Sequence, residues 1–234
     1  MRTLRTSAGT LEFSGGEPWL MATVTPGPGA VEQAVEGVRA GARIIGIREG
    51  IAWADLIRRV RGELSVPLAA LTGAAGSAEA GIIAGAAIVD ASGGIESPEL
   101  PELCARLGAG LVVPVGTPSA ATGALLDAAL MHGAGAGVAA ARDRPLLLHA
   151  ESPELPRELA AVARGVELGV SVLAVRNVDA AADFLAVHGV LYGRREIDPD
   201  LRLPPELRRE PAGAAGAAGA AGAAGAAGVV HPPS

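Results

Sequence analysis

Short apolar runs alternate with helical repeats along most of this chain. Apolar runs occupy residues 18–25, 42–47, 66–71, 86–90, 111–115, 145–149 and 170–175. Helical spacing of apolar positions occupies residues 31–38, 52–60, 77–84, 98–107, 121–131, 154–168 and 178–192. Continuous apolar strands separated by helices are typical of a parallel sheet that is covered on both faces. The pattern therefore predicts an α/β fold.

The number of strands and the length of the chain favour a barrel. A TIM-type (β/α) barrel has eight strands, and a chain of 234 residues lies near the lower end of its usual length. The pattern supplies seven strands, and the glycine-rich residues 133–140 are either a degenerate eighth strand or a connection. We therefore expect a TIM-type (β/α) barrel that is incomplete or irregular, with the last helix packed outside it.

The end of the chain has a different composition. Residues 213–228 are Gly-Ala-Ala repeats without proline, so they do not have the composition of a collagen triple helix. A glycine at every third position also costs a helix about 1 kcal/mol each relative to alanine. We expect one barrel domain at residues 1–210 and a disordered tail at residues 211–234.

The composition excludes several kinds of chemistry. All 19 basic residues are arginine, so neither a Schiff-base lysine nor a lysine phosphate clamp is available. The net charge is −6 and no basic stripe is present, so nucleic acid is not an expected partner. The one cysteine, Cys104, falls in a helical repeat and is expected in the core, and it excludes an internal disulfide. No leader and no apolar run long enough for a membrane helix is found, so we expect a cytoplasmic protein without a membrane partner.

Three segments at strand ends resemble dihydropteroate synthase and the wider pterin-binding barrel family. Residues 23–26 read TVTP, where the family has Asn-Val-Thr-Pro. Residues 41–47 read GARIIGI against Gly-Ala-Asp-Ile-Ile-Asp-Ile, and residues 172–178 read VLAVRNV against Ile-Leu-Arg-Val-His-Asp-Val. The resemblance covers roughly residues 14–190. It implies a barrel, a place in folate biosynthesis, and a reaction that displaces diphosphate from a hydroxymethyl-dihydropterin with 4-aminobenzoate.

Charged residues of the family are missing at several of these strand ends. The asparagine associated with magnesium is Thr23, the aspartates of the second and third strands are Gly46 and Leu71, and the arginine of the last strand is Ala174. The family's Gly-Phe-Gly-Lys and Ser-Arg-Lys segments have no counterpart. Each oriented electrostatic group typically contributes about 10²–10³ in rate. The resemblance therefore favours a catalytically degenerate binding or regulatory homologue, a pseudoenzyme, over the alternative of an active divergent synthase or other transferase.

Five strand-end residues remain as candidates for substrate binding. Thr25 and Thr72 match the family directly, and Asp90 stands in a segment similar to Asn-Asp-Val-Ser-Gly. Asp90 either accepts hydrogen bonds from a pterin ring or stabilises the turn before the following glycines. Arg48 binds an anionic group, pairs with Glu49 or an adjacent loop carboxylate, or is a solvated loop charge, which is the favoured interpretation.

The last candidate, Arg176, stands where the family has a cation, or it pairs with Asp179 or Asp183. His149 and Glu151 form the nearest polar pair after the sixth strand, and a lone pair at this spacing is a weak signal of function. A pterin-like small molecule is the expected ligand. A homodimer or a pairing with an intact synthase is the expected assembly. No cofactor and no metal site is expected, and Mg²⁺ would be needed only by an active synthase.

Overall fold

The computed structural model describes residues 2–13, 16–114, 125–127 and 144–196. The chain divides into two units, Met1–Arg195 and Glu196–Ser234, and every element below belongs to the first unit. The predicted disordered tail at residues 211–234 lies outside the described residues.

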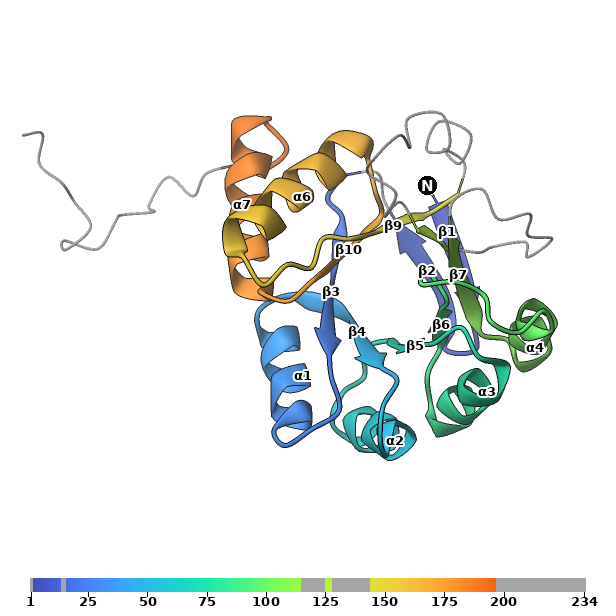
Figure 1. Ribbon diagram of the computed structural model, residues 1–234. Coiled ribbons are helices and arrows are strands. Elements are labelled where there is room, and N and C mark those ends of the chain that lie inside the picture. Colours follow the sequence, from blue (N-terminus) through green and yellow to red (C-terminus); the bar gives the residue numbers. More distant parts are fainter. Residues whose placement is uncertain (1, 14–15, 115–124, 128–143, 197–234) are drawn as a thin grey trace, which may run out of the picture. The chain divides into compact units, whose positions relative to one another are not determined.

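Eight parallel strands form a closed ring, so the predicted α/β barrel is confirmed (Figure 1). Their order around the ring is β10, β3, β4, β5, β6, β7, β8 and β9. The bounds are β3 Trp19–Val24, β4 Ala42–Arg48, β5 Leu68–Leu71, β6 Ile88–Asp90, β7 Gly110–Pro114, β8 Leu125–Asp127, β9 Leu146–His149 and β10 Val172–Val175. Because all eight run parallel, their carboxyl ends meet at one mouth of the barrel.

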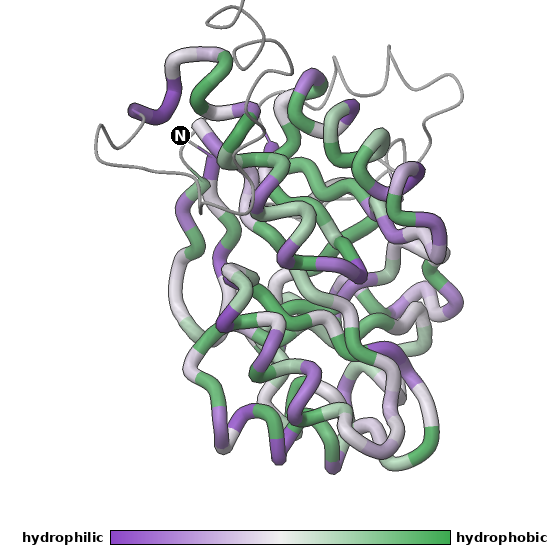
Figure 2. Tube along the Cα trace, turned by 90° about the vertical axis from the view of Figure 1, so that its left-hand side faces the viewer, coloured by the Kyte–Doolittle hydropathy of each residue, from purple (hydrophilic) through white to green (hydrophobic). Residues whose placement is uncertain are grey.

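Helices cover the outside of the ring. Their bounds are α1 Ala30–Arg39, α2 Trp53–Glu63, α3 Ala75–Ala84, α4 Leu100–Leu107, α6 Leu155–Leu168 and α7 Val178–Leu191. In Figure 2 the hydrophilic segments lie mainly on the outer turns of the helices, and the segments inside are mostly hydrophobic. The predicted outside position of the last helix is confirmed, because Val178, Ala181 and Leu185 of α7 pack in the same apolar cluster as Leu20 and Leu173 of the strands.

Alternate residues of each strand belong to two separate apolar layers. In β3, Leu20 and Ala22 face the helices, whereas Met21 belongs to an inner cluster with Ile44 and Val172. Successive side chains of a strand point to opposite faces, and both faces are buried here. This is why the strands appear in the sequence as unbroken apolar runs.

An N-terminal hairpin fills the floor of the barrel, and the sequence pattern did not predict it. The antiparallel strands β1 (Arg2–Thr6) and β2 (Gly9–Phe13) join at a tight turn in which Gly9 has a φ of 119°. The side chains of Leu4, Leu11 and Phe13 are buried and join the inner cluster of the barrel. The hairpin thus closes the end opposite the mouth.

The ring has local irregularities. The pairing of β3 with β4 shifts register between Leu20 and Met21. The strand β8 lies within residues 121–131, which the sequence predicted as helix, so that prediction is wrong at 125–127. Residues 133–140, the other candidate for an eighth strand, lie outside the described residues. Within the described ranges, no helix has the length and apolar character needed to cross a membrane.

Candidate functional site

A cavity of about 420 Å³ opens at the carboxyl ends of the strands. Its walls come from the ends of β4, β5, β6 and β9 and the loops that follow them. The lining residues are Arg48, Leu71, Thr72, Gly73, Asp90, Ser92, Gly93, Gly94, Glu96, His149 and Glu151. Three of the five predicted binding residues, Arg48, Thr72 and Asp90, are therefore brought together.

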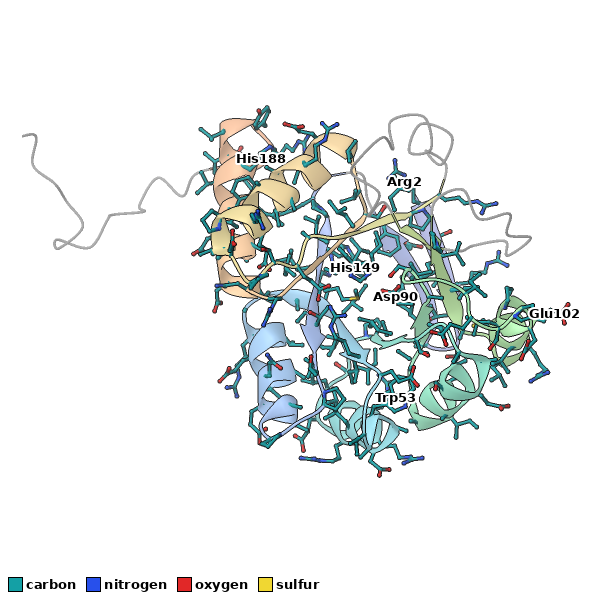
Figure 3. All side chains as sticks on the ribbon, viewed as in Figure 1. Arg2, Trp53, Asp90, Glu102, His149 and His188 are labelled. Atoms are coloured by element: carbon teal, nitrogen blue, oxygen red, sulfur yellow. The ribbon has the colours of Figure 1, made fainter. Side chains whose placement is uncertain are left out.

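Four ionisable side chains of opposite sign form a continuous array across this mouth. Asp90 Oδ2 lies 3.0 Å from His149 Nε2, and His149 Nδ1 lies 3.1 Å from Glu151 Oε2. Arg48 then donates to Glu151 Oε1 at 2.6 Å. We call these four residues the mouth array. The contact between Asp90 and His149 joins β6 to β9, which are separated in the ring by β7 and β8. Figure 3 shows Asp90 and His149 together inside the ring of strands.

The carboxyl group of Glu151 is held in its ionised form. Burial alone would raise its pKa. Hydrogen bonds from His149, Thr23 and Arg48, together with the charge of Arg48, outweigh burial and lower the pKa to about 2. His149 lies between this carboxylate and that of Asp90, so a protonated imidazole can donate to both. The array then alternates in sign from Arg48 to Asp90.

The sequence left open whether Asp90 stabilises the local turn or faces a ligand site. In the structure its carboxylate both contacts the turn and lines the cavity. Its side chain is 1% exposed. Its Oδ1 accepts a hydrogen bond from the backbone N–H of Ser92 at 3.0 Å, which is the local turn interaction. Its Oδ2 contacts His149 inside the cavity, where Ser92 Oγ also lies 3.0 Å from His149 Nε2. The turn therefore orients a carboxylate that lines the cavity.

Thr72 is fixed by a second carboxylate beside the array. Its hydroxyl donates to Glu49 Oε2 at 2.6 Å and accepts a hydrogen bond from the backbone N–H of Ala74 at 3.2 Å. Ser77 also donates to Glu49. Arg48 pairs with Glu151, a carboxylate of the loop after β9, and has no ion pair with Glu49 among the described contacts. Of the surroundings that the sequence left open, pairing with a nearby carboxylate is therefore the one observed.

The space beside Gly46 is filled by neighbouring side chains. A Cβ atom added to Gly46 would lie 2.9 Å from Leu71 Cδ1 and 3.3 Å from Met21 Sδ. Leu71 therefore occupies the space that a larger residue at position 46 would need. Ala174 lies fully buried in the inner cluster.

The other two predicted binding residues lie elsewhere. Thr25 is exposed and does not line the cavity. Arg176 is exposed and lines a separate cavity of about 420 Å³ among α1, α6 and α7. The backbone N–H groups of Arg176 and Asn177 donate to the buried carboxylate of Glu158, and this fixes the loop after β10. Thr25 and Arg176 both follow the carboxyl ends of strands, β3 and β10, as predicted, but neither lines the cavity that contains Asp90.

The donor set does not fit a magnesium ion. The hydroxyl of Thr23, the residue that matches the family's asparagine in the sequence, donates to Glu151 and is a weaker oxygen ligand than an amide carbonyl. Mg²⁺ prefers carboxylates, phosphates and waters in octahedral geometry. In the part of the chain that the structure describes, no three His, Cys, Asp or Glu side chains are grouped to hold a metal.

Comparison with known proteins identifies the fold. No protein-family model matches the chain, and no curated protein matches it. Solved structures do resemble it. Dihydropteroate synthase of Burkholderia cenocepacia, complexed with 7,8-dihydropteroate, has a TM-score of 0.66 at 18% identity over 82% of this chain and 97% of that one. The 7,8-dihydropteroate synthase of Vibrio fischeri has a TM-score of 0.69 at 13% identity, over 84% and 100%.

A third structure, Rv1207 of Mycobacterium tuberculosis, has a TM-score of 0.65 at 22% identity over 80% of this chain and 96% of that one. At these identities the likeness establishes a shared barrel fold along nearly the whole length of each neighbour. The chain therefore has the fold of the dihydropteroate synthases.

Proposed function

We propose that the protein binds a reduced pterin, or a closely similar aminoheterocycle, in the cavity at the mouth of the barrel. The observation that carries this proposal is Asp90, a buried carboxylate that a turn orients into the cavity. Each carboxylate oxygen has two lone pairs, so Asp90 can accept further hydrogen bonds beside those from Ser92 and His149. The amino and ring N–H groups of a pterin are suitable donors.

The fold and the neighbouring side chains support the same ligand class. Two structures with this fold, from Burkholderia cenocepacia and Xanthomonas albilineans, are complexes with 7,8-dihydropteroate. Beside Asp90, the side chains of Thr72 and Ser92 add hydroxyl groups, and Leu71 adds an apolar wall. A largely fixed wall with a few polar groups is the usual form of a small-molecule site.

We further propose that the protein does not catalyse dihydropteroate synthesis. Displacement of diphosphate needs cations at the leaving group. The chain contains no lysine, Ala174 replaces the family's arginine, and Arg176 lies in another cavity. Such a protein would act as a binding or regulatory homologue in folate biosynthesis, as a homodimer or paired with an intact synthase. Turnover with both substrates and Mg²⁺, or rescue of a synthase-deficient strain, would instead support the alternative of an active divergent synthase.

Calorimetry with a reduced pterin tests the binding proposal. Asp90→Ala removes a charged hydrogen bond worth about 1.5–3 kcal/mol, so affinity should fall roughly 10- to 150-fold. Glu102→Ala, which removes an exposed carboxylate of α4, is the matched control and should leave affinity unchanged. Melting temperature is measured on both variants. If Asp90 serves only the turn, Asp90→Ala lowers the melting temperature and leaves affinity intact, and the proposal fails.

A further inference from the structure

The charged groups of the cavity are compensated by one another. Arg48 is bound to Glu151 at 2.6 Å, and His149 lies within 3.1 Å of both Glu151 and Asp90. Even with the imidazole protonated, the two cations of the mouth array are matched by its two carboxylates. Glu96, which is exposed at the edge of the cavity, adds a further negative charge. The described lining therefore carries a net negative charge.

Three backbone N–H groups around the cavity already donate within the protein. The N–H of Ser92 donates to Asp90 Oδ1, and the N–H of Gly94 donates to the carbonyl of Ala91 at 2.9 Å. The N–H of Glu96 donates to the carbonyl of Gly73 at 2.9 Å. These amides belong to the turns that build the wall. A phosphate group needs arginine side chains or unused N–H groups aimed at it.

Arg176, the other arginine that the sequence predicted to bind an anion, also lies among acidic residues. Arg176 shares its cavity with Glu36, Glu158 and Asp179, and it does not line the cavity that contains Asp90. Among the described residues, a phosphorylated tail that extends from a ring at Asp90 would meet the exposed carboxylate of Glu96, and the cations that line this cavity are already paired with carboxylates. Like charges at such short range disfavour binding.

We infer that the cavity selects a reduced pterin whose side group is uncharged, and that it discriminates against the diphosphate ester of the same pterin. This inference rests on the proposed function and specifies its ligand. The ring is bound at Asp90 through its N–H groups, and the tail lies near Glu96. The selected ligand is an alcohol or alkyl pterin, the form that contains no leaving group for displacement.

The test compares two ligands that differ only in the tail. Calorimetry uses 6-hydroxymethyl-7,8-dihydropterin and its diphosphate at low ionic strength, without divalent cations. We expect the alcohol to bind at least tenfold more tightly, and the difference to narrow as salt is added. Equal or tighter binding of the diphosphate overturns the inference and leaves the proposed function standing. If neither ligand binds, the proposed function fails and the inference fails with it.

A charge reversal at the cavity edge provides a second readout. Glu96→Arg changes an exposed side chain, so the fold should be retained. We expect the affinity for the diphosphate to rise at least fivefold, while the affinity for the alcohol changes less than twofold. Glu99→Arg makes the same change of charge at an exposed position that does not line the cavity, and should have little effect. Equal effects of the two variants would mean that only the overall charge matters, and would overturn the inference.

Discussion

The two ends of the barrel differ in polarity. At the floor, the hairpin residues Leu4 and Phe13 are buried among inner strand residues, and Trp19 packs on Phe13 with ring centroids 4.9 Å apart. At the mouth, Asp90, His149 and Glu151 are partly or fully buried but polar, and a cavity opens above them. The floor removes apolar surface from water, whereas the mouth positions charges.

This difference teaches where stability and binding reside in the fold. In (β/α) barrels the strand carboxyl ends carry function and the opposite face carries stability. Here the floor is closed by a segment that contributes no residue to the cavity lining. Substitutions at the floor should therefore change the free energy of unfolding, and substitutions at the mouth should change ligand affinity and pH dependence.

The largest effect is expected at the floor, from Leu4→Ala. Leu4 is fully buried, and a large-to-small core substitution costs about 2–5 kcal/mol of unfolding free energy. Urea denaturation measures this loss. Thr10→Ala, at an exposed position of the same hairpin, should cost less than about 0.5 kcal/mol. A loss below about 1 kcal/mol for Leu4→Ala would show that the hairpin does not stabilise the barrel.

The second prediction concerns the acid stability that Glu151 gives to the mouth. Its folded pKa of about 2 lies below the ordinary value of 4.5, so its contribution is present above pH 4.5 and is lost as the pH falls towards 2. Glu151→Gln removes this dependence. The difference in unfolding free energy between the native protein and Glu151→Gln should shrink by on the order of 1–2 kcal/mol between pH 5 and pH 3.

Other carboxylates titrate in the same range, so the comparison needs a control. Glu167 forms an exposed ion pair with Arg164 one helical turn away, and Glu167→Gln should give a nearly constant difference from the native protein over this pH range. Parallel pH profiles for Glu151→Gln and the native protein would contradict a lowered pKa at Glu151.

The smallest effect is expected from Arg43→Ala, again at the floor. The guanidinium of Arg43 lies 3.8 Å from the ring centroid of Trp19, and an exposed cation–π contact is worth about 0.5–1 kcal/mol. Urea denaturation should detect this loss, and Arg39→Ala, an exposed arginine of α1, serves as the control. Equal losses for the two variants would mean that the ring contact contributes nothing.

Most strands of the ring could be predicted from apolar runs, but strand β8 and the N-terminal hairpin could not. The runs that became β3, β4 and β10 are buried on both faces, so tertiary packing agrees with the local pattern. Residues 125–127 lie in an alanine-rich stretch with helical spacing, and pairing with β7 and β9 places them in a strand instead. The hairpin was missed because each strand offers only one or two apolar residues, although Leu11 and Phe13 do alternate with polar neighbours.

The sequence could predict which residues stand at strand ends, but not which of them contact one another across the mouth. Strand-end position alone brought Asp90, Thr72 and Arg48 to one mouth. It could not show that His149 and Glu151 complete the mouth array, because those partners lie 59 and 103 residues from Asp90 and Arg48 respectively. It also could not show that Arg176 lines a different cavity from Asp90, in a loop whose backbone is held by the buried carboxylate of Glu158.

The hairpin has a consequence for how the chain is made. It is synthesised before the barrel strands, yet its buried side chains share a cluster with Val172 and Ala174, which are synthesised more than 150 residues later. The ring of strands is incomplete until β10 emerges and pairs with β3. Before that, the apolar cluster that buries Leu4, Leu11 and Phe13 is also incomplete. Contacts of such long sequence separation form slowly and leave apolar surface exposed in the meantime. The apolar side chains of the hairpin should therefore stay exposed in the growing chain until β10 is available.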